Sequence, residues 1–171
     1  LLIDSTIVKV PEVNGNKISD NLQNEVELVI AIGKDGINIP EDKAGEHIFG
    51  YGVGIDFTLR DLQAEDKKKG LPWTVSKGFM SSAPVSEIVM KETAGDAQNL
   101  DISLKINGET KQSANTSLMI FKINYIVHYL SCIFGLKKGD LIFTGTPAGI
   151  TKLDTGDVVE AYIQNIGDLK I

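Results

Sequence analysis

Short apolar stretches of strand length recur along this chain, and few helix-length segments separate them. The clearest is residues 26–32, where apolar side chains follow the two-residue period of a β-strand at Val26, Leu28, Ile30 and Ile32. Further strand patterns lie at residues 51–57, 102–106, 141–143 and 158–163. A doubly wound parallel sheet needs a helix between successive strands. The pattern therefore predicts a strand-rich α+β fold instead.

Two segments carry helix patterns. Residues 58–69 have helix-forming composition and are followed by Gly70, a typical residue just after a helix. Residues 123–133 have apolar side chains at helical spacing, at Ile123, Ile126, Val127, Leu130 and Ile133, and Gly135 follows. Asn107-Gly108 is a strong signal for a two-residue hairpin turn. We expect one compact unit with two or three helices.

Length and charge indicate which classes of protein this chain fits. The 171 residues, 42% of them hydrophobic, suffice for one domain with a buried core. The chain has 17 Lys and Arg against 23 Asp and Glu, a net charge of −6, so we expect no nucleic-acid partner and no membrane. Cys132 is the single cysteine, so no intrachain disulfide can form. We expect it to be buried and inert, in a cytoplasmic protein.

Glu25 and Glu27 are the first candidates for chemistry. Residues two apart on a strand point to the same side, so the two carboxylates share a face and repel each other unless a cation lies between them. A solvated strand face explains a lone Glu-x-Glu pair more simply. The sharper alternative is a site of oxygen ligands for a hard cation such as Mg²⁺.

Asp56 lies at the end of the apolar segment 51–57. It suits two roles, because an Asp can cap the helix that follows or add a third carboxylate to Glu25 and Glu27. Arg60 comes four residues later and can meet Asp56 near the helix start, as an ordinary surface ion pair or as part of a site.

The remaining candidates are weaker. Lys77 stands in a low-charge irregular stretch, and residues 143–149 form a loop with two hydroxyls and two glycines that can offer N–H groups to an anion. A plain turn explains that loop equally well. His128 is expected to be structural, and neither it nor His47 has the spacing of a zinc motif.

Taken together, several ordered segments resemble the fumarylacetoacetate hydrolase family. They are residues 25–28, 54–63, 69–79, 106–109, 139–149 and 156–160, and the resemblance spans residues 22–171. The Lys-Gly-Leu-Pro-Trp segment at residues 69–73 resembles most closely the small members of the acylpyruvase and oxaloacetate decarboxylase type.

The resemblance implies a mixed β-roll, homodimeric assembly and a divalent metal, Mg²⁺ or Mn²⁺, held by Glu25, Glu27 and Asp56. It also places Arg60 and Lys77 among the catalytic residues. Gln63, Gly145 and Thr146 match positions that bind substrate. Since three carboxylates outweigh the two charges of one cation, Arg60 and Lys77 would offset the remainder and admit an anionic substrate.

The implied activity is Mg²⁺-dependent cleavage of a C–C bond in a small oxo-acid, by acylpyruvate hydrolysis or oxaloacetate decarboxylation through a stabilised enolate. An enzyme of the 2-hydroxyhepta-2,4-diene-1,7-dioate isomerase/decarboxylase type is an alternative. A metal-binding homologue with impaired catalysis is another.

The N-terminal part departs from the family pattern. Relatives carry a His and a Glu on a short helix, thought to activate water and to form part of a lid, and nothing in residues 1–24 matches them. We therefore expect a degenerate N-terminal segment at residues 1–21, followed by the catalytic domain at residues 22–171.

Overall fold

Two four-stranded sheets form the centre of the protein, whose computed structural model describes residues 7–171. The first sheet has the order β10-β4-β5-β7 and the second β12-β11-β8-β9. The first comprises β4 (Val26–Ile32), β5 (Ile48–Ile55), β7 (Val89–Met90) and β10 (Leu141–Phe143). The second comprises β8 (Asp101–Ile106), β9 (Glu109–Asn115), β11 (Val159–Ile163) and β12 (Gly167–Lys170).

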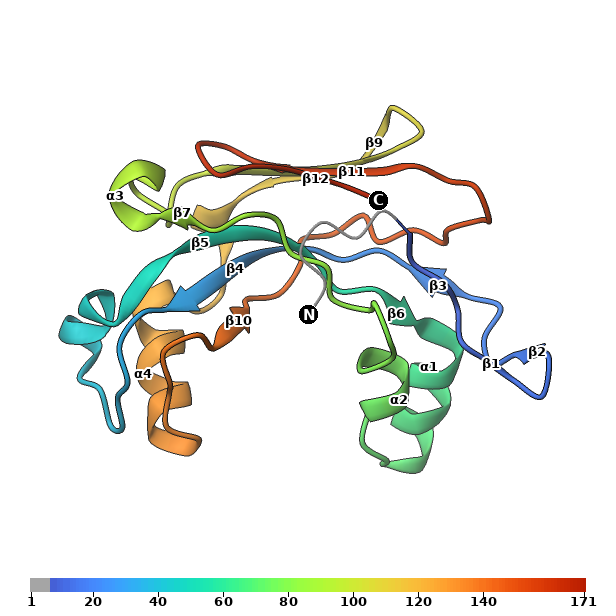
Figure 1. The fold of residues 1–171 in the computed structure, drawn as a ribbon, viewed down its shortest axis with the longest axis horizontal. Coiled ribbons are helices and arrows are strands. Elements are labelled where there is room, and N and C mark those ends of the chain that lie inside the picture. The colour runs from blue at the N-terminus through green and yellow to red at the C-terminus, as the bar shows by residue number, and fades with distance from the viewer. Residues whose placement is uncertain (1–6) are drawn as a thin grey trace.

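The two sheets lie against each other as layers, and the longer helices lie beyond the first sheet (Figure 1). Contacts between β5 and both β11 and β12, and between β4 and β8, join the layers. The helices are α1 (Arg60–Lys69), α2 (Thr74–Lys77), α3 (Lys91–Ala94) and α4 (Ile123–Ile133), with 3-10 turns η1 (Glu41–Glu46) and η2 (Thr116–Leu118). The strand-rich α+β fold is confirmed, and the strand pairs within residues 7–171 are antiparallel rather than mixed.

Strand β4 is buried along its whole length, because sheet neighbours flank it and side chains cover both of its faces. Val26, Leu28 and Ile30 are at most 1% exposed, and burying each such side chain contributes about 1.5–3 kcal/mol. The glycine-rich partner β5 allows close packing: a Cβ at Gly54 would lie 2.5 Å from Val29 Cγ2 and 2.7 Å from Phe143 Cε1. The sheet is therefore closely packed at the end where Glu25, Glu27 and Asp56 lie.

Local sequence signals correctly predict one hairpin turn and the C-terminal end of one helix. Asn107 and Gly108 take φ angles of 52° and 81° in the turn that joins β8 to β9, as the hairpin signal predicts. Gly70 ends α1 with a φ of 67°. The helix begins at Arg60 rather than residue 58, because β6 (Thr58–Leu59) pairs with β3 (Leu22–Gln23).

Helix α4 corrects two expectations. Ile123 and Val127 face the core, but Ile133 is 58% exposed, and Cys132 is exposed rather than buried. The helix packs on η1, and its buried residues Ile123, Val127 and Ser131 repeat every four positions. Cys132 and Ile133 lie in the last turn beside Ser131, on the exposed side of the helix. His128 is structural as expected, since its Nδ1 lies 2.6 Å from the Ile39 carbonyl oxygen.

The N-terminal part forms a small hairpin of β1 (Glu12–Val13) and β2 (Asn16–Lys17), which pair with each other. Residues 1–6 of the expected N-terminal segment lie outside the described residues, so the division between residues 21 and 22 stays a prediction. Across residues 7–171, no helix combines the length and the apolar character that crossing a bilayer requires.

Candidate metal centre

Three carboxylates gather at one end of the β4–β5 pair. Glu25 immediately precedes β4, Glu27 lies within it, and Asp56 directly follows β5. The antiparallel register places Glu27 opposite Gly54, and the Asp56 N–H donates to the Glu25 carbonyl oxygen at 2.8 Å. One oxygen from each carboxylate lies within 4.8 Å of the others. The geometry therefore brings together the three residues that the resemblance names as metal ligands.

Two of these carboxylates are buried and have specific partners. Glu25 and Glu27 are 8% and 4% exposed, and buried charges need compensation. Arg60 Nη2 donates to Glu25 Oε1. Lys77 Nζ lies 2.7 Å from Glu25 Oε2 and 2.5 Å from Asp56 Oδ2. Glu27 accepts the Gly145 N–H at 2.6 Å and forms no ion pair within the described part of the chain.

Electrostatics at the site favours a bound cation. Burial raises the pKa of Glu27 to about 7; the Gly145 N–H opposes this rise, while the charges of Asp56 and Glu25 add to it. Burial also raises the pKa of Asp56, against the hydrogen bond from Lys77. Three acidic groups face two basic ones, Arg60 and Lys77. An all-oxygen donor set with excess negative charge fits a hard divalent cation.

Arg60 links the carboxylates to helix α1. Its Nε donates to Gln23 Oε1 at 2.7 Å and its Nη1 to Gln63 Oε1 at 2.5 Å. The direct partner of Arg60 is thus Glu25, whereas the sequence spacing suggested Asp56. Asp56 does not cap α1 either, since no side chain caps that helix and the Asp56 carboxylate binds Lys77 instead.

Lys77 reaches the site from a short helix within the stretch expected to be irregular. Helix α2 packs on α1 and β6, and the Lys77 N–H donates to the Trp73 carbonyl oxygen at 3.0 Å. Its side chain is 24% exposed, so the ammonium is largely enclosed. The fold thus directs this lysine at the carboxylates.

The loop after β10 completes the site and reveals a residue that the sequence did not suggest. Thr144 Oγ1 donates to the Leu28 carbonyl oxygen at 2.8 Å, and Gly145 donates to Glu27. Thr146 Oγ1 accepts a hydrogen bond of 2.8 Å from Nε2 of Gln112. Gln112 lies on β9, where it is the one buried residue among exposed and half-buried neighbours. A strand without apolar alternation carries no signal for such a residue.

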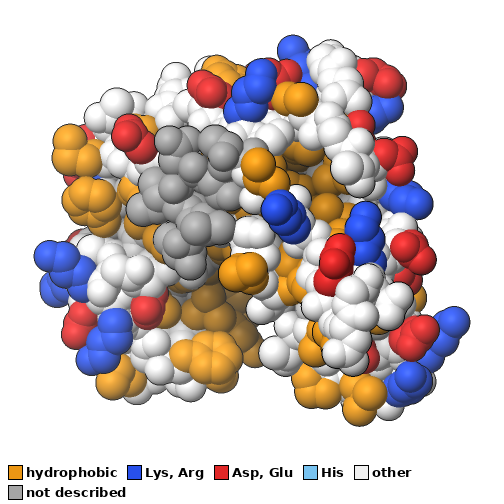
Figure 2. Space-filling view, turned by 45° about the vertical axis from the view of Figure 1, so that its right-hand side comes forward, with side chains coloured by type: hydrophobic (Ala, Val, Ile, Leu, Met, Phe, Trp, Pro, Cys, Tyr) orange, Lys and Arg blue, Asp and Glu red, His pale blue; other side chains and the backbone are white. Residues whose placement is uncertain are grey.

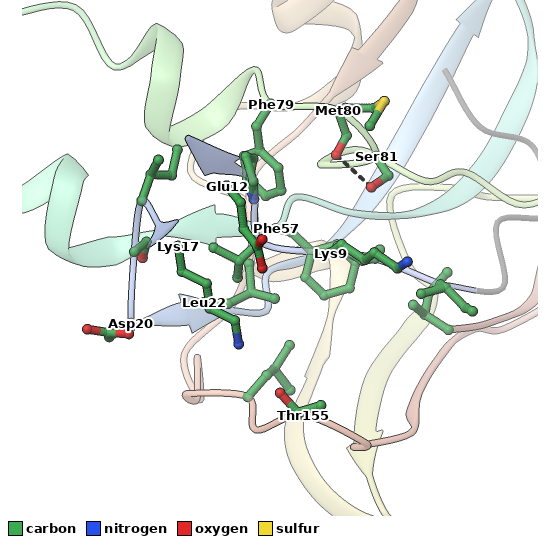
Figure 3. Close-up of a pocket in the computed structure, with 18 of the residues that line it drawn as sticks. Lys9, Glu12, Lys17, Asp20, Leu22, Phe57, Phe79, Met80, Ser81 and Thr155 are labelled. Atoms are coloured by element: carbon green, nitrogen blue, oxygen red, sulfur yellow. Dashed lines mark hydrogen bonds between the residues drawn. The ribbon is translucent and has the colours of Figure 1, made fainter. Parts of the chain in front are cut away.

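A large groove lies beside this site but does not contain it. Its volume is 1710 Å³, and its walls come from residues 7–20, the segment 74–81 and the loop 152–157. Figure 3 shows Phe57 and Phe79 in it, near Lys9 and Glu12. None of the candidate site residues lines the groove. On the face seen in Figure 2, acidic and basic side chains are interspersed and no basic patch stands out.

Comparisons with known proteins agree with this geometry. A model of the fumarylacetoacetate (FAA) hydrolase C-terminal family matches residues 2–171. The mitochondrial oxaloacetate tautomerase of Mus musculus is 48% identical over 150 residues, 88% of this chain and 68% of that protein.

Solved structures give the same picture. Fumarylpyruvate hydrolase from Pseudomonas aeruginosa, in complex with Mn²⁺ and pyruvate, superposes with a TM-score of 0.87 at 39% identity, over 90% of this chain and 66% of that one. For 2-hydroxyhepta-2,4-diene-1,7-dioate isomerase from Mycobacterium marinum the TM-score is 0.82 at 37% identity, over 90% and 58%. The chain thus spans roughly two thirds, or less, of the length of these relatives.

Proposed function

Because the chain belongs to the fumarylacetoacetate hydrolase family, we propose that it is a Mg²⁺-dependent enzyme that cleaves a C–C bond in a small oxo-acid. The observation that supports this most directly is the cluster of Glu25, Glu27 and Asp56, whose oxygens lie within 4.8 Å of one another. The Mn²⁺ and pyruvate named for the Pseudomonas aeruginosa relative suit the same donor set and substrate class.

When bound by these oxygens, a divalent cation would supply Lewis-acid stabilisation of negative charge on the keto oxygen of the substrate. Lys77 contributes a positive charge at the carboxylates. Its ammonium has three N–H groups, of which two donate to Glu25 and Asp56, so one is left to donate to a substrate. Arg60 holds Glu25 in place and keeps Gln63 close. The Thr146 hydroxyl lies on the neighbouring loop and can donate to a substrate carboxylate.

Two other activities use the same arrangement. Tautomerisation of oxaloacetate is favoured by the 48% identity to the mouse tautomerase. Isomerisation or decarboxylation of a hydroxydienedioate is favoured by the Mycobacterium marinum structure. All three reactions pass negative charge to an oxygen next to a carboxylate, so the residues at the metal centre serve each of them.

The test is a substrate panel with purified protein. We expect Mg²⁺-dependent release of pyruvate from oxaloacetate and from an acylpyruvate, measured with a coupled lactate dehydrogenase assay. The ultraviolet absorbance of enol-oxaloacetate reports tautomerisation in the same samples, and chelation of the metal should abolish each signal.

Three results would change the proposal. Tautomerisation without pyruvate release would show that the protein is an oxaloacetate tautomerase and does not cleave a C–C bond. Turnover of the hydroxydienedioate alone would favour isomerisation or decarboxylation of that substrate. Metal binding without turnover of any substrate would indicate a metal-binding homologue with impaired catalysis.

A further inference from the structure

Gln112 is a buried amide in which every hydrogen-bonding group is used near the metal centre. It is 1% exposed. Its Oε1 accepts from Asn24 Nδ2 at 2.8 Å and from the Val26 N–H at 3.1 Å. Its Nε2 donates to Thr146 Oγ1 and to the Pro147 carbonyl oxygen, both at 2.8 Å. One side chain therefore joins two segments that lie far apart in sequence.

The acceptor side of Gln112 fixes the start of β4. Val26 lies between Glu25 and Glu27, so a hydrogen bond to its N–H holds the backbone that carries both carboxylates. Asn24, the other donor, also binds the loop, since its Oδ1 accepts the Thr151 N–H at 3.2 Å. The entry to β4 and the loop after β10 are thereby tied together at two points.

The donor side of Gln112 fixes the loop that carries Thr146. This loop already lies tightly against β9, because a Cβ at Gly149 would be 2.1 Å from the Lys111 carbonyl oxygen. The amide of Gln112 also determines which hydrogen-bonding role is left to the Thr146 hydroxyl. A hydroxyl has one hydrogen and two lone pairs. Since Gln112 donates to the oxygen, the hydroxyl hydrogen remains available to another acceptor.

We propose that Gln112 is a positioning residue for the oxo-acid site: it sets the distance between the metal ligands and Thr146 and leaves the Thr146 hydroxyl as a donor toward the substrate carboxylate. This inference rests on the proposed function, and it extends it by naming which group faces that carboxylate. Gln112 acts through Thr146 and the loop, and it is not itself a catalytic residue.

The first experiment replaces Gln112 by Met, which has similar length and no hydrogen-bonding amide. We expect the KM for the turned-over oxo-acid to rise by about tenfold or more, as for a lost hydrogen bond to a charged group. The Mg²⁺ affinity should change far less, because the three carboxylates remain. A double-mutant cycle with Thr146→Val should be strongly non-additive, with the double variant close to Thr146→Val alone.

A matched control separates positioning from stability. Thr116 is also buried, at the start of η2 just after β9. Its hydroxyl accepts the Leu100 N–H and donates to the Ala97 carbonyl oxygen. Thr116→Val should lower the unfolding temperature and leave KM unchanged. If Gln112→Met does not fold, Gln112→Glu keeps the size and the acceptor oxygen while removing the amide donors, and the same measurements apply.

A second readout does not depend on activity. Amide hydrogen exchange of Gly145 and Thr151, relative to Leu104 in β8, should accelerate in Gln112→Met and not in Thr116→Val. A Gln112→Met protein with wild-type KM and wild-type loop exchange would overturn the proposal, and so would an additive cycle with Thr146→Val. If wild-type protein turns over no oxo-acid, the proposed function fails, and loop exchange alone then decides whether Gln112 positions the loop.

Discussion

Lys77 and Asp56 form a direct ion pair, with Nζ 2.5 Å from Oδ2, and the same ammonium lies 2.7 Å from Glu25 Oε2. One cation is thus shared by two of the three carboxylates assigned as metal ligands. It offsets their charge, and it also competes for their lone pairs.

Replacing Lys77 by Met should separate these two effects. We expect turnover to fall by about 100-fold or more, because a charge that stabilises the reacting anion is lost. The Mg²⁺ affinity should stay the same or increase, since the competing ammonium is gone. Isothermal titration with Mg²⁺ and the pyruvate-release assay measure the two quantities. Lys67→Met, on the exposed side of α1, is the control, and loss of Mg²⁺ binding by folded Lys77→Met would contradict the assignment.

Glu27→Gln tests the metal centre itself. The amide keeps an acceptor for the Gly145 N–H but removes a ligand charge, so we expect the Mg²⁺ affinity to fall by roughly tenfold or more. The unfolding temperature without metal should not fall, because a buried charge without an ion pair is removed. Glu92→Gln, on an exposed helix, should leave both quantities unchanged. Unaltered Mg²⁺ affinity would show that Glu27 is not a ligand.

The raised pKa of Glu27 makes metal binding depend on pH. Below its value of about 7 the carboxyl holds a proton that Mg²⁺ must displace, so the affinity should decline as the pH falls and binding should release a proton. Without metal, the raised pKa stabilises the fold at low pH, and this contribution is lost as the pH rises through about 7. Calorimetry in buffers of different ionisation enthalpy measures the proton. An affinity that is flat between about pH 5.5 and 8 would contradict this linkage.

Features that depend on neighbouring residues were predicted well from the sequence. The Asn107-Gly108 turn and the end of α1 at Gly70 follow from backbone preferences alone. The strand period placed Glu25 and Glu27 on one face. Asp56 is different, because only the β4–β5 register brings it to them, and the sequence left capping as an alternative. The structure excludes capping, because the Asp56 carboxylate binds Lys77, and the role of Asp56 as a metal ligand stays a prediction.

Features that depend on distant packing were missed. Gln112 lies on a strand with no apolar period, so nothing in the local sequence distinguishes it from the exposed and half-buried residues beside it. Ile133 follows the apolar pattern of α4 and Cys132 precedes it, yet both are exposed, because the buried side of the helix holds Ile123, Val127 and Ser131. The homodimer and the cytoplasmic location stay predictions.

Gly54→Ala tests how tightly the sheet holds the metal centre. Gly54 lies directly opposite Glu27 in the β4–β5 pair. A Cβ at Gly54 would lie 2.5 Å from Val29 Cγ2 and 2.7 Å from Phe143 Cε1. Overpacking of this kind costs about 1–3 kcal/mol, and a shift of β5 would also displace Asp56. We expect a lower free energy of unfolding and weaker Mg²⁺ binding. Gly45→Ala is the matched control, because its Cβ would only approach Asn124 Oδ1 at 3.9 Å. Equal stability of the two variants would mean that β4 and β10 can move apart, and that the carboxylates are not held by this packing.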